Sequence, residues 1–326
     1  MKKFFDLQLF ADTDFLKDNL QGFVPVPIAS EIIRAVTRGS SVLRLSNIQQ
    51  MTSETQKFPV LVSGPGAYWV GETERISTST AQWIHPEIVA KKIAVIIPVT
   101  REKLNDTTID VFAELRPYIA EAFYKTIDEA CLFGTNSPFA KSIYSAALSC
   151  GNAIADNATI KLDLEISDVM ALVEDKGFDV NGFVAGIQFK NSLRKLRDAN
   201  GNQLYVTGLT DANNNRYDTL YSFPIEFGRN GAWDNTKALC IGGNWKYSIV
   251  GIREQIQFDI LREATLENVT MSDGKPLSLA EQDMVGIRAT MRLGFLPVRD
   301  DAFAMLVPTG AATSSTDTSV TPSTTP

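Results

Sequence analysis

The clearest pattern in the chain lies between residues 107 and 134, where apolar side chains recur every three or four positions. This spacing predicts one long helix with a single buried face, formed by Phe112, Leu115, Ile119, Phe123, Ile127 and Cys131. Thr107 and Asp110 resemble a capping box at its start, and Gly134 would end it. The helix would be about 40 Å long, as in the spine of an elongated object. Pro117 should bend it or remove a hydrogen bond.

The stretch before this helix is predicted to form strands, after a short N-terminal helix capped by Ser30. Residues 42–62 and 87–100 are strand-like, and the segment between them is rich in Thr, Ser and Gly. We therefore expect residues 54–98 to form one long hairpin. Its limbs are too polar to build a core alone. A lone two-stranded ribbon is marginal in water, so the hairpin should lie against another surface.

Two tryptophans, Trp69 and Trp83, flank the polar tip of this hairpin. Large aromatic side chains are typical anchors of protein interfaces, so the tip is predicted to contact a partner. The alternative is that the ribbon packs against its own chain.

The second half of the chain alternates helix and strand between residues 164 and 250. The pattern predicts a helix, a buried strand, a basic helix and a second buried strand, over residues 166–173, 182–187, 189–196 and 238–241. This segment could form an α/β domain of its own. Two long strands should follow on either side of a turn at 273–276, over residues 247–258 and 283–296.

Composition narrows the class of protein. The 326 residues are 44% hydrophobic and 21% charged, which excludes a wholly disordered chain, a collagen and a coiled coil. The net charge of −7 offers no general basic surface for nucleic acid, so such contacts should be weak or local. No apolar stretch approaches the length of a membrane span, and the N-terminus lacks the apolar core of a signal peptide. A cytoplasmic chain is expected. The Ser, Thr and Pro-rich tail, residues 308–326, should not fold.

Cysteine and histidine limit the available chemistry. Cys131, Cys150 and Cys240 are odd in number and form no CxxC pair, so a disulfide framework is not expected and a reducing compartment fits. The single histidine, His85, excludes zinc sites built on two histidines. A catalytic triad would have to use it, but the sequence names no nucleophile beside it, so His85 is predicted to be structural or interfacial.

Three further motifs have simple interpretations. The calcium-like run 211–215 has Arg216 where glycine is required and Ser222 where glutamate is required, so it is predicted to be a polar turn. The glycines at 64, 66 and 71 lack the spacing of a nucleotide-binding loop. A basic face on the helix 189–196 could meet phosphate, although a solvated or salt-bridged surface is favoured; it comprises Lys190, Arg194, Lys195 and Arg197. We expect neither metal nor cofactor.

The order of several segments resembles the major capsid proteins of tailed bacteriophages, the Hong Kong 97 fold family. The matching segments cover nearly all of residues 22–308 and are Phe23–Ile33, Ala67–Glu72, Ile97–Asp106, Asp283–Arg292 and Ala302–Leu306. The resemblance implies an α+β fold with an N-terminal arm, an extended β-hairpin loop, a spine helix in a peripheral domain and an α/β axial domain. The corresponding division of the chain is leader and arm 1–22, first peripheral part 23–53, extended loop 54–98, spine helix and peripheral domain 99–163, axial domain 164–245, return strands and peripheral loop 246–307, and tail 308–326.

The resemblance also implies a function. The chain would be a structural protein without enzymatic activity that assembles as pentamers and hexamers into an icosahedral shell around double-stranded DNA. It would belong to the virion and assemble in the host bacterial cytoplasm. Its partners would be other copies, a portal protein and a maturation protease, with packaged DNA contacted weakly and no membrane. Because about 22 residues precede the fold, a separate scaffolding protein is expected.

Two features of the sequence refine this expectation. Some family members form a Lys–Asn cross-link from the extended loop, but no lysine lies between Lys57 and Lys91, so no such bond is predicted. The leader Asp6–Ala11 is similar to one that a cysteine protease removes from a ribosomal protein and some phage capsid proteins of Firmicutes. Cleavage between Phe10 and Ala11 is therefore predicted; the simpler interpretation is an uncleaved arm.

Two alternatives stay open on the sequence. One is an encapsulin, a nanocompartment shell of the same fold that holds cargo enzyme. The other is a soluble enzyme with residues 164–250 as a substrate domain, although no acid/base cluster supports it. For a shell, the residues predicted to contact a neighbouring subunit lie on the extended loop: Trp69, Glu72, Arg75 and Trp83.

Overall fold

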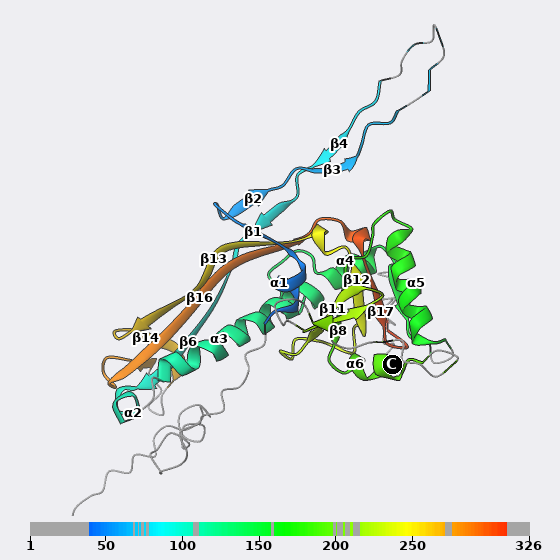
Figure 1. Ribbon diagram of the computed structural model, residues 1–326. Coiled ribbons are helices and arrows are strands. Elements are labelled where there is room, and N and C mark those ends of the chain that lie inside the picture. The colour runs from blue at the N-terminus through cyan, green and yellow to red at the C-terminus, as the bar shows by residue number, and fades with distance from the viewer. Residues whose placement is uncertain are drawn as a thin grey trace, which may run out of the picture. The chain divides into compact units, whose positions relative to one another are not determined.

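A computed structural model (Figure 1) describes residues 39–311, except for 68, 71, 73–74, 76–77, 107–110, 158–159, 198–199, 201–204, 206–208, 211–215 and 271–275. The leader, the helix predicted after Ser30, the capping box at 107–110, the calcium-like run and most of the tail lie outside the described residues. The described chain divides into two compact units. One takes in residues 92–123 and 254–292, and the other takes in the remainder. Along the chain, the units change between residues 91 and 92, 123 and 124, 253 and 254, and 292 and 293.

The larger unit is built on a seven-stranded sheet. Its spatial order is β7 (Ala153–Ala155), β17 (Phe303–Val307), β12 (Cys240–Gly243), β8 (Gly182–Gly186), β11 (Phe223–Gly228), β10 (Arg216–Leu220) and β9 (Leu209–Thr210). The central strand β8 pairs parallel to β11 and antiparallel to β12. All residues of β8 and β17 are buried, which explains why each is a continuous apolar or glycine run rather than an alternating one.

Helices cover this sheet as the periodicity predicted. α5 (Leu162–Glu174) buries Ile166, Val169 and Val173, spaced three and four residues apart, in one core with β8, β11 and β17. α6 (Phe189–Lys195) adds Phe189 and Leu193 to the same core. The predicted helices at 166–173 and 189–196 and the predicted buried strands at 182–187 and 238–241 are therefore confirmed. The sheet also recruits β7 and β17 from outside residues 164–245.

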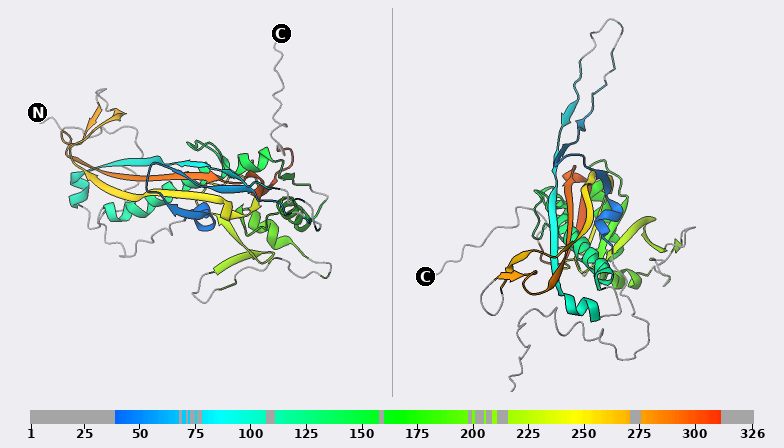
Figure 2. Two further views of the ribbon diagram at one scale, coloured as in Figure 1. Left: turned by 90° about the horizontal axis from the view of Figure 1, so that it is seen from above. Right: turned by 90° about the vertical axis from the view of Figure 1, so that its left-hand side faces the viewer.

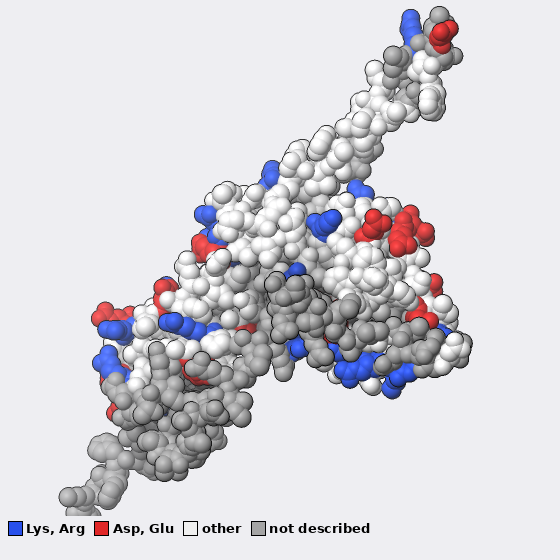
Figure 3. All heavy atoms as spheres, in the orientation of Figure 1, with Lys and Arg blue, Asp and Glu red and all other residues white. Residues whose placement is uncertain are grey.

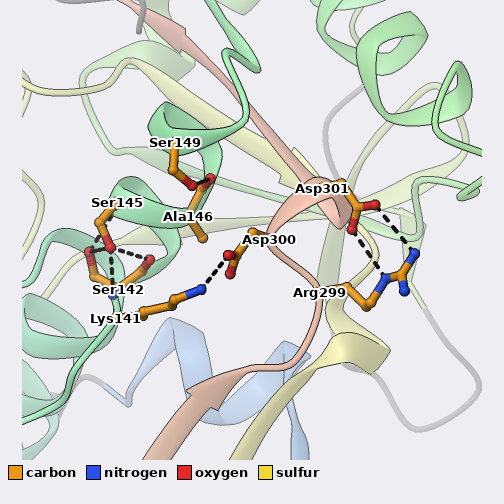
Figure 4. Close-up of polar contacts among 8 residues, drawn as sticks. All are labelled: Lys141, Ser142, Ser145, Ala146, Ser149, Arg299, Asp300 and Asp301. Carbon is orange, nitrogen blue, oxygen red and sulfur yellow. Dashed lines mark hydrogen bonds and ion pairs between the residues drawn. The ribbon is translucent and has the colours of Figure 1, made fainter. Parts of the chain in front are cut away.

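The end of this sheet near β17 carries a polar cluster (Figure 4). α4 (Ile143–Ser149) begins with a capping box, in which the Ser142 hydroxyl accepts a hydrogen bond from the Ser145 amide and Ser145 accepts one from the Ser142 amide. Lys141 pairs with Asp300 in the 3-10 turn η4 (Asp300–Ala302). These contacts join α4 to the turn that leads into β17.

A second sheet is built mainly from long strands. A four-stranded sheet has the order β1 (Asn47–Gln50), β13 (Ser248–Leu261), β16 (Met284–Pro297) and β6 (Lys91–Thr100). Figure 2, in its left view, shows β6, β13 and β16 running side by side. The cross-strand ion pair between Arg288 and Asp259, 2.8 Å apart, links β16 to β13. The two long strands predicted at 247–258 and 283–296 are confirmed. They are joined through a small hairpin that the sequence pattern did not predict, β14 (Thr265–Thr270) with β15 (Pro276–Ser278).

The spine helix is confirmed with one modification. α3 (Val111–Asp128) contains Pro117 and continues into a π-helical turn, η2 (Glu129–Phe133), which ends at Gly134 in the left-handed conformation (φ 67°). Of the predicted buried face, Ile119, Phe123, Ile127 and Cys131 are at most 4% exposed. A separate short helix, α2 (Arg101–Asp106), precedes it.

One prediction of local structure was wrong. Residues 42–45, expected to belong to a strand, lie in the helix α1 (Ser41–Leu45). The side chain of Ser40 accepts a hydrogen bond from the Leu43 amide, as an N-cap requires. The β-branched and leucine-rich sequence favours neither state strongly, and the helix is fixed by a buried carboxylate described below.

Candidate assembly surface: the extended ribbon

The predicted hairpin is present as two successive two-stranded pairings, which together we call the ribbon (residues 55–89; Figure 1). Nearest its base, β2 (Thr55–Lys57) pairs with β5 (Glu87–Val89), and farther out β3 (Val60–Ser63) pairs with β4 (Gln82–Ile84). Both pairings are antiparallel. Beyond residue 90 the returning limb leaves the ribbon and enters the long sheet as β6.

The base of the ribbon is anchored in a small core. Met51, Ile88, Ala90 and Ile249 are buried together, with Phe58, Leu296 and Val298 packed around them. At this anchor the backbones of β13 and β16 come unusually close to the ribbon base, at Gly251 and Gly294. A Cβ on Gly294 would lie 2.3 Å from the Ile88 side chain, and one on Gly251 would lie 2.5 Å from the Met51 sulfur. Glycine at these positions therefore lets the ribbon base dock.

Polar contacts reinforce the anchor. The Arg253 guanidinium donates hydrogen bonds to the carbonyls of Met51 (3.1 Å) and Thr52 (2.6 Å). β1 lies parallel to β13, with Asn47 opposite Ile249 and Gln50 opposite Ile252. The chain that enters the ribbon is thus held by side chains and by a sheet ladder.

A buried carboxylate fixes the segment that precedes this anchor. Asp128, at the end of α3, accepts hydrogen bonds from the Ser40 hydroxyl, the Ser41 amide (3.0 Å), the Val42 amide (3.2 Å) and the Asn230 side chain (2.7 Å). Burial raises the pKa of Asp128, and the four donors act in the opposite direction. The carboxylate supplies the first amides of α1 with partners, which explains the helix that sequence patterning missed.

Outside its anchor the ribbon exposes apolar side chains. Trp69 is fully exposed (104%) and Trp83 is 56% exposed, so neither is buried in a core of the described chain. Glu72 and Arg75 are also exposed. The structure therefore places all four predicted contact residues on the ribbon surface. Sequence reasoning missed three further exposed apolar residues of the ribbon: Leu61 and Ile84, both 44% exposed, and Val70, 38% exposed. The sequence does indicate these residues, because they are apolar positions in a hairpin that is too polar to form a core of its own.

The predicted basic face of α6 is smaller than expected. Lys190 turns inward, pairs with Asp218 and lies 4.9 Å from the centre of the Phe227 ring. Only Arg194, Lys195 and Arg197 of the four are exposed. Figure 3 shows Lys and Arg side chains gathered over this helix, at the lower right of the view. Because Lys190 is held by Asp218, it has a structural role and is not available to bind phosphate.

A hollow of about 430 Å³ is lined by polar and apolar side chains, including Asp156, Phe189, Ser192 and Lys195. The described residues contain no group of three or more His, Cys, Asp or Glu side chains placed to hold a metal ion. His85 is exposed on the ribbon. Within the described segments, no helix combines the length and the apolar character of a membrane span.

These features define a class of protein. The chain combines a spine helix, long strands, an α/β unit and an anchored ribbon with exposed apolar side chains. This combination is typical of a subunit that assembles with other subunits. The ribbon by itself is not stable as a free element in water, and exposed apolar surface of this kind marks protein interaction sites.

Comparison with known proteins identifies the family. The sequence profile of the phage capsid family matches residues 21–307. The chain is 35% identical over 306 residues to the major capsid protein of Staphylococcus phage 80alpha, covering 93% of this chain and 90% of that protein. The chain therefore belongs to the phage capsid family and is a structural capsid protein.

Solved structures agree with this fold. A chain of Microbacterium phage Oxtober96 superposes with a TM-score of 0.75 at 30% identity, covering 89% of this chain and 97% of that one. A chain of Mycobacterium phage Adephagia gives 0.76 at 25% identity, covering 91% and 98%. The expected Hong Kong 97-type α+β fold is confirmed, and the match to phage capsid proteins disfavours the encapsulin and enzyme alternatives.

Proposed function

We propose that this chain is the major capsid protein of a tailed phage and assembles as pentamers and hexamers into an icosahedral shell around double-stranded DNA. The observation that carries the proposal is the anchored ribbon, on which Trp69 is fully exposed and Trp83 is more than half exposed. In a shell, a neighbouring subunit covers these side chains. The chain acts as a building block and not as an enzyme.

We place the subunit contact at the predicted ribbon residues, Trp69, Glu72, Arg75 and Trp83. The two tryptophans supply apolar area, and Glu72 and Arg75 supply charges of opposite sign that can fix the register of the contact. Residues 54–98 act as the extended loop and residues 164–245 as the axial domain near the centre of a capsomer. Residues 99–163 and 246–307 form most of the peripheral domain.

The partners follow from the resemblance to tailed-phage capsid proteins. We expect a separate scaffolding protein, a portal protein at one vertex and assembly in the host bacterial cytoplasm. Contact with packaged DNA should be weak, because a chain of net charge −7 offers few cations to replace the counter-ions of DNA.

We also propose removal of the leader during maturation, with cleavage between Phe10 and Ala11. Intact-mass measurement of the capsid protein from purified particles tests this step. A mass corresponding to a chain that begins at Ala11 supports cleavage, and an intact Met1–Phe10 segment refutes it.

The assembly function is tested by expressing the chain with and without its neighbouring phage proteins, followed by size-exclusion chromatography and negative-stain microscopy. Rings, sheets or closed shells support the proposal. A small, monodisperse oligomer under every condition contradicts it.

A further inference from the structure

We propose that the stem of the ribbon, formed by β3 and β4, is covered on both of its faces in the assembled shell, each time by another copy of this chain. The inference rests on the proposed shell function and adds to it how the ribbon is held. It makes the stem an inserted element between two neighbours and not a strap lying on one.

The strand register shows that the stem has two apolar faces. Leu61 pairs with Trp83, and Val60 pairs with Ile84. Side chains of directly opposed residues lie on the same face, and successive residues along a strand point to opposite faces. Leu61 and Trp83 therefore form one apolar face, which we call the tryptophan face. Val60 and Ile84 form the other, the isoleucine face.

Both faces are open in the isolated chain. On the tryptophan face Leu61 is 44% and Trp83 is 56% exposed, and on the isoleucine face Ile84 is 44% exposed. A sheet that buries one face and exposes the other to solvent normally carries polar side chains on the exposed face. The stem does not follow that rule, because its isoleucine face is also apolar.

The distribution of charge supports the same conclusion. No Asp, Glu, Lys or Arg occurs in residues 58–71 or 76–86, so charges are confined to the tip and the base. Figure 3 shows the stem without blue or red atoms between the base and the tip. Free sheet edges and ribbons are usually protected by charged side chains, above all lysine. A stem that lacks them is suited to burial.

One flat neighbour cannot cover both faces, because they point in opposite directions. The core at the ribbon base includes neither Val60 nor Ile84, and Ile84 remains 44% exposed. The partner that a capsid subunit always has is another copy of itself, and a closed lattice surrounds each subunit with several. A second copy is therefore the occupant assigned to each face.

The test uses thiol labelling of each face in turn. In a Cys150→Ser background the remaining cysteines, Cys131 and Cys240, are at most 2% exposed and serve as internal controls of folding. Leu61→Cys reports on the tryptophan face and Ile84→Cys on the isoleucine face. Labelling rates with a maleimide are measured on unassembled subunits and on shells assembled from this chain and its scaffolding protein only.

Both reporters should react readily in subunits and at least about tenfold more slowly in shells, as expected for side chains in the desolvated centre of an interface. Protection of only one reporter in shells would overturn the two-sided burial while leaving the shell function intact. Protection of the second face only after a further phage protein is added would assign that face to a different partner and would also overturn the proposal. Failure of the Cys150→Ser chain and of the unmodified chain to form shells would instead refute the proposed function.

A second measurement does not depend on the engineered cysteines. Hydroxyl-radical footprinting of the unmodified chain compares oxidation of Trp83 and Ile84, neighbours in sequence on opposite faces of the stem. Both should lose reactivity on assembly. Continued oxidation of Ile84 in shells, with Trp83 protected, would show that the stem is covered on one face only.

Discussion

Asp128 illustrates how a single residue can connect distant parts of the chain. It lies in the polar environment at the end of the spine helix and accepts hydrogen bonds from residues 40, 41, 42 and 230. Burying a carboxylate is costly unless its oxygens find donors. Here four donors meet it, so the side chain is both a helix cap for α1 and a link to the loop at Asn230.

Replacing this carboxylate should destabilise the subunit. Asp128→Asn turns one acceptor oxygen into a donor that faces existing donors, so we expect a loss of about 2–3 kcal/mol in the free energy of unfolding. Chemical denaturation of unassembled subunits measures it. Asp175→Asn, on an exposed residue after α5, is the matched control and should change stability by less than about 0.5 kcal/mol. Equal stability of both variants would show that the buried network is unimportant.

The three cysteines should differ in reactivity. Burial raises the pKa of Cys240 to about 12 and raises that of Cys131 as well, so neither forms a thiolate near neutral pH. Cys150 is exposed. Titration of the folded subunit with a thiol reagent should therefore modify one cysteine per chain, and all three after unfolding. Rapid modification of Cys131 or Cys240 in the folded chain would contradict the packing described.

At the scale of elements, periodicity predicted the helices and strands that carry strong patterns. The spine helix follows from apolar residues three or four positions apart, and β8 follows from a continuous apolar run. The π-helical turn at 129–133 and the hairpin of β14 and β15 were not predicted, because neither leaves a periodic signal. Helix α1 was mistaken for a strand because its first two amides, those of Ser41 and Val42, pair with Asp128, which is far away in sequence.

The docking of the ribbon base depends on close strand approach. Gly294→Ala places a methyl group 2.3 Å from the Ile88 side chain and 2.9 Å from the Val89 carbonyl oxygen, so the ribbon base has to move. We expect a loss of about 1–3 kcal/mol and faster proteolysis near residue 90. Gly64→Ala is the control, since its new methyl group would meet nothing within 4 Å. Identical melting temperatures for the two variants would refute this account of the glycine.

At the scale of the whole molecule, we propose that other copies of the chain stabilise the ribbon. Its predicted contact residues are exposed, and its stem carries apolar side chains on two faces. Most of the apolar area that would stabilise it is therefore still open in the single chain. This explains why a domain with a well-packed core also presents surface that a monomer would avoid.

Charge reversal at the ribbon tip tests the proposed contact. We expect Glu72→Lys and Arg75→Glu singly to lower the yield of assembled particles by about tenfold or more, since a reversed charge meets a like charge or loses its partner across the interface. The melting temperature of unassembled subunits should not change, because both side chains are exposed. Particle yield by sedimentation gives the result, and the double variant shows whether the two positions are coupled. Normal assembly of both single variants would place these residues outside any critical contact.

The sequence by itself determined the elements and the family. Apolar periodicity fixed the spine helix, the buried strands and the existence of the hairpin, and the order of short segments carried the resemblance to phage capsid proteins, which the comparisons confirmed. These properties are local or linear, so they can be read along one chain.

Only the tertiary structure decided which of these residues meet. It brought Asp128 to the start of α1, Gly294 to Ile88, and Lys190 to Asp218, which reduced the predicted basic face. It also set the register that places Leu61 with Trp83 on one face of the ribbon and Ile84 on the other. Register and long-range contact depend on how separate segments pack, and a shift of one residue in strand pairing would exchange the two faces.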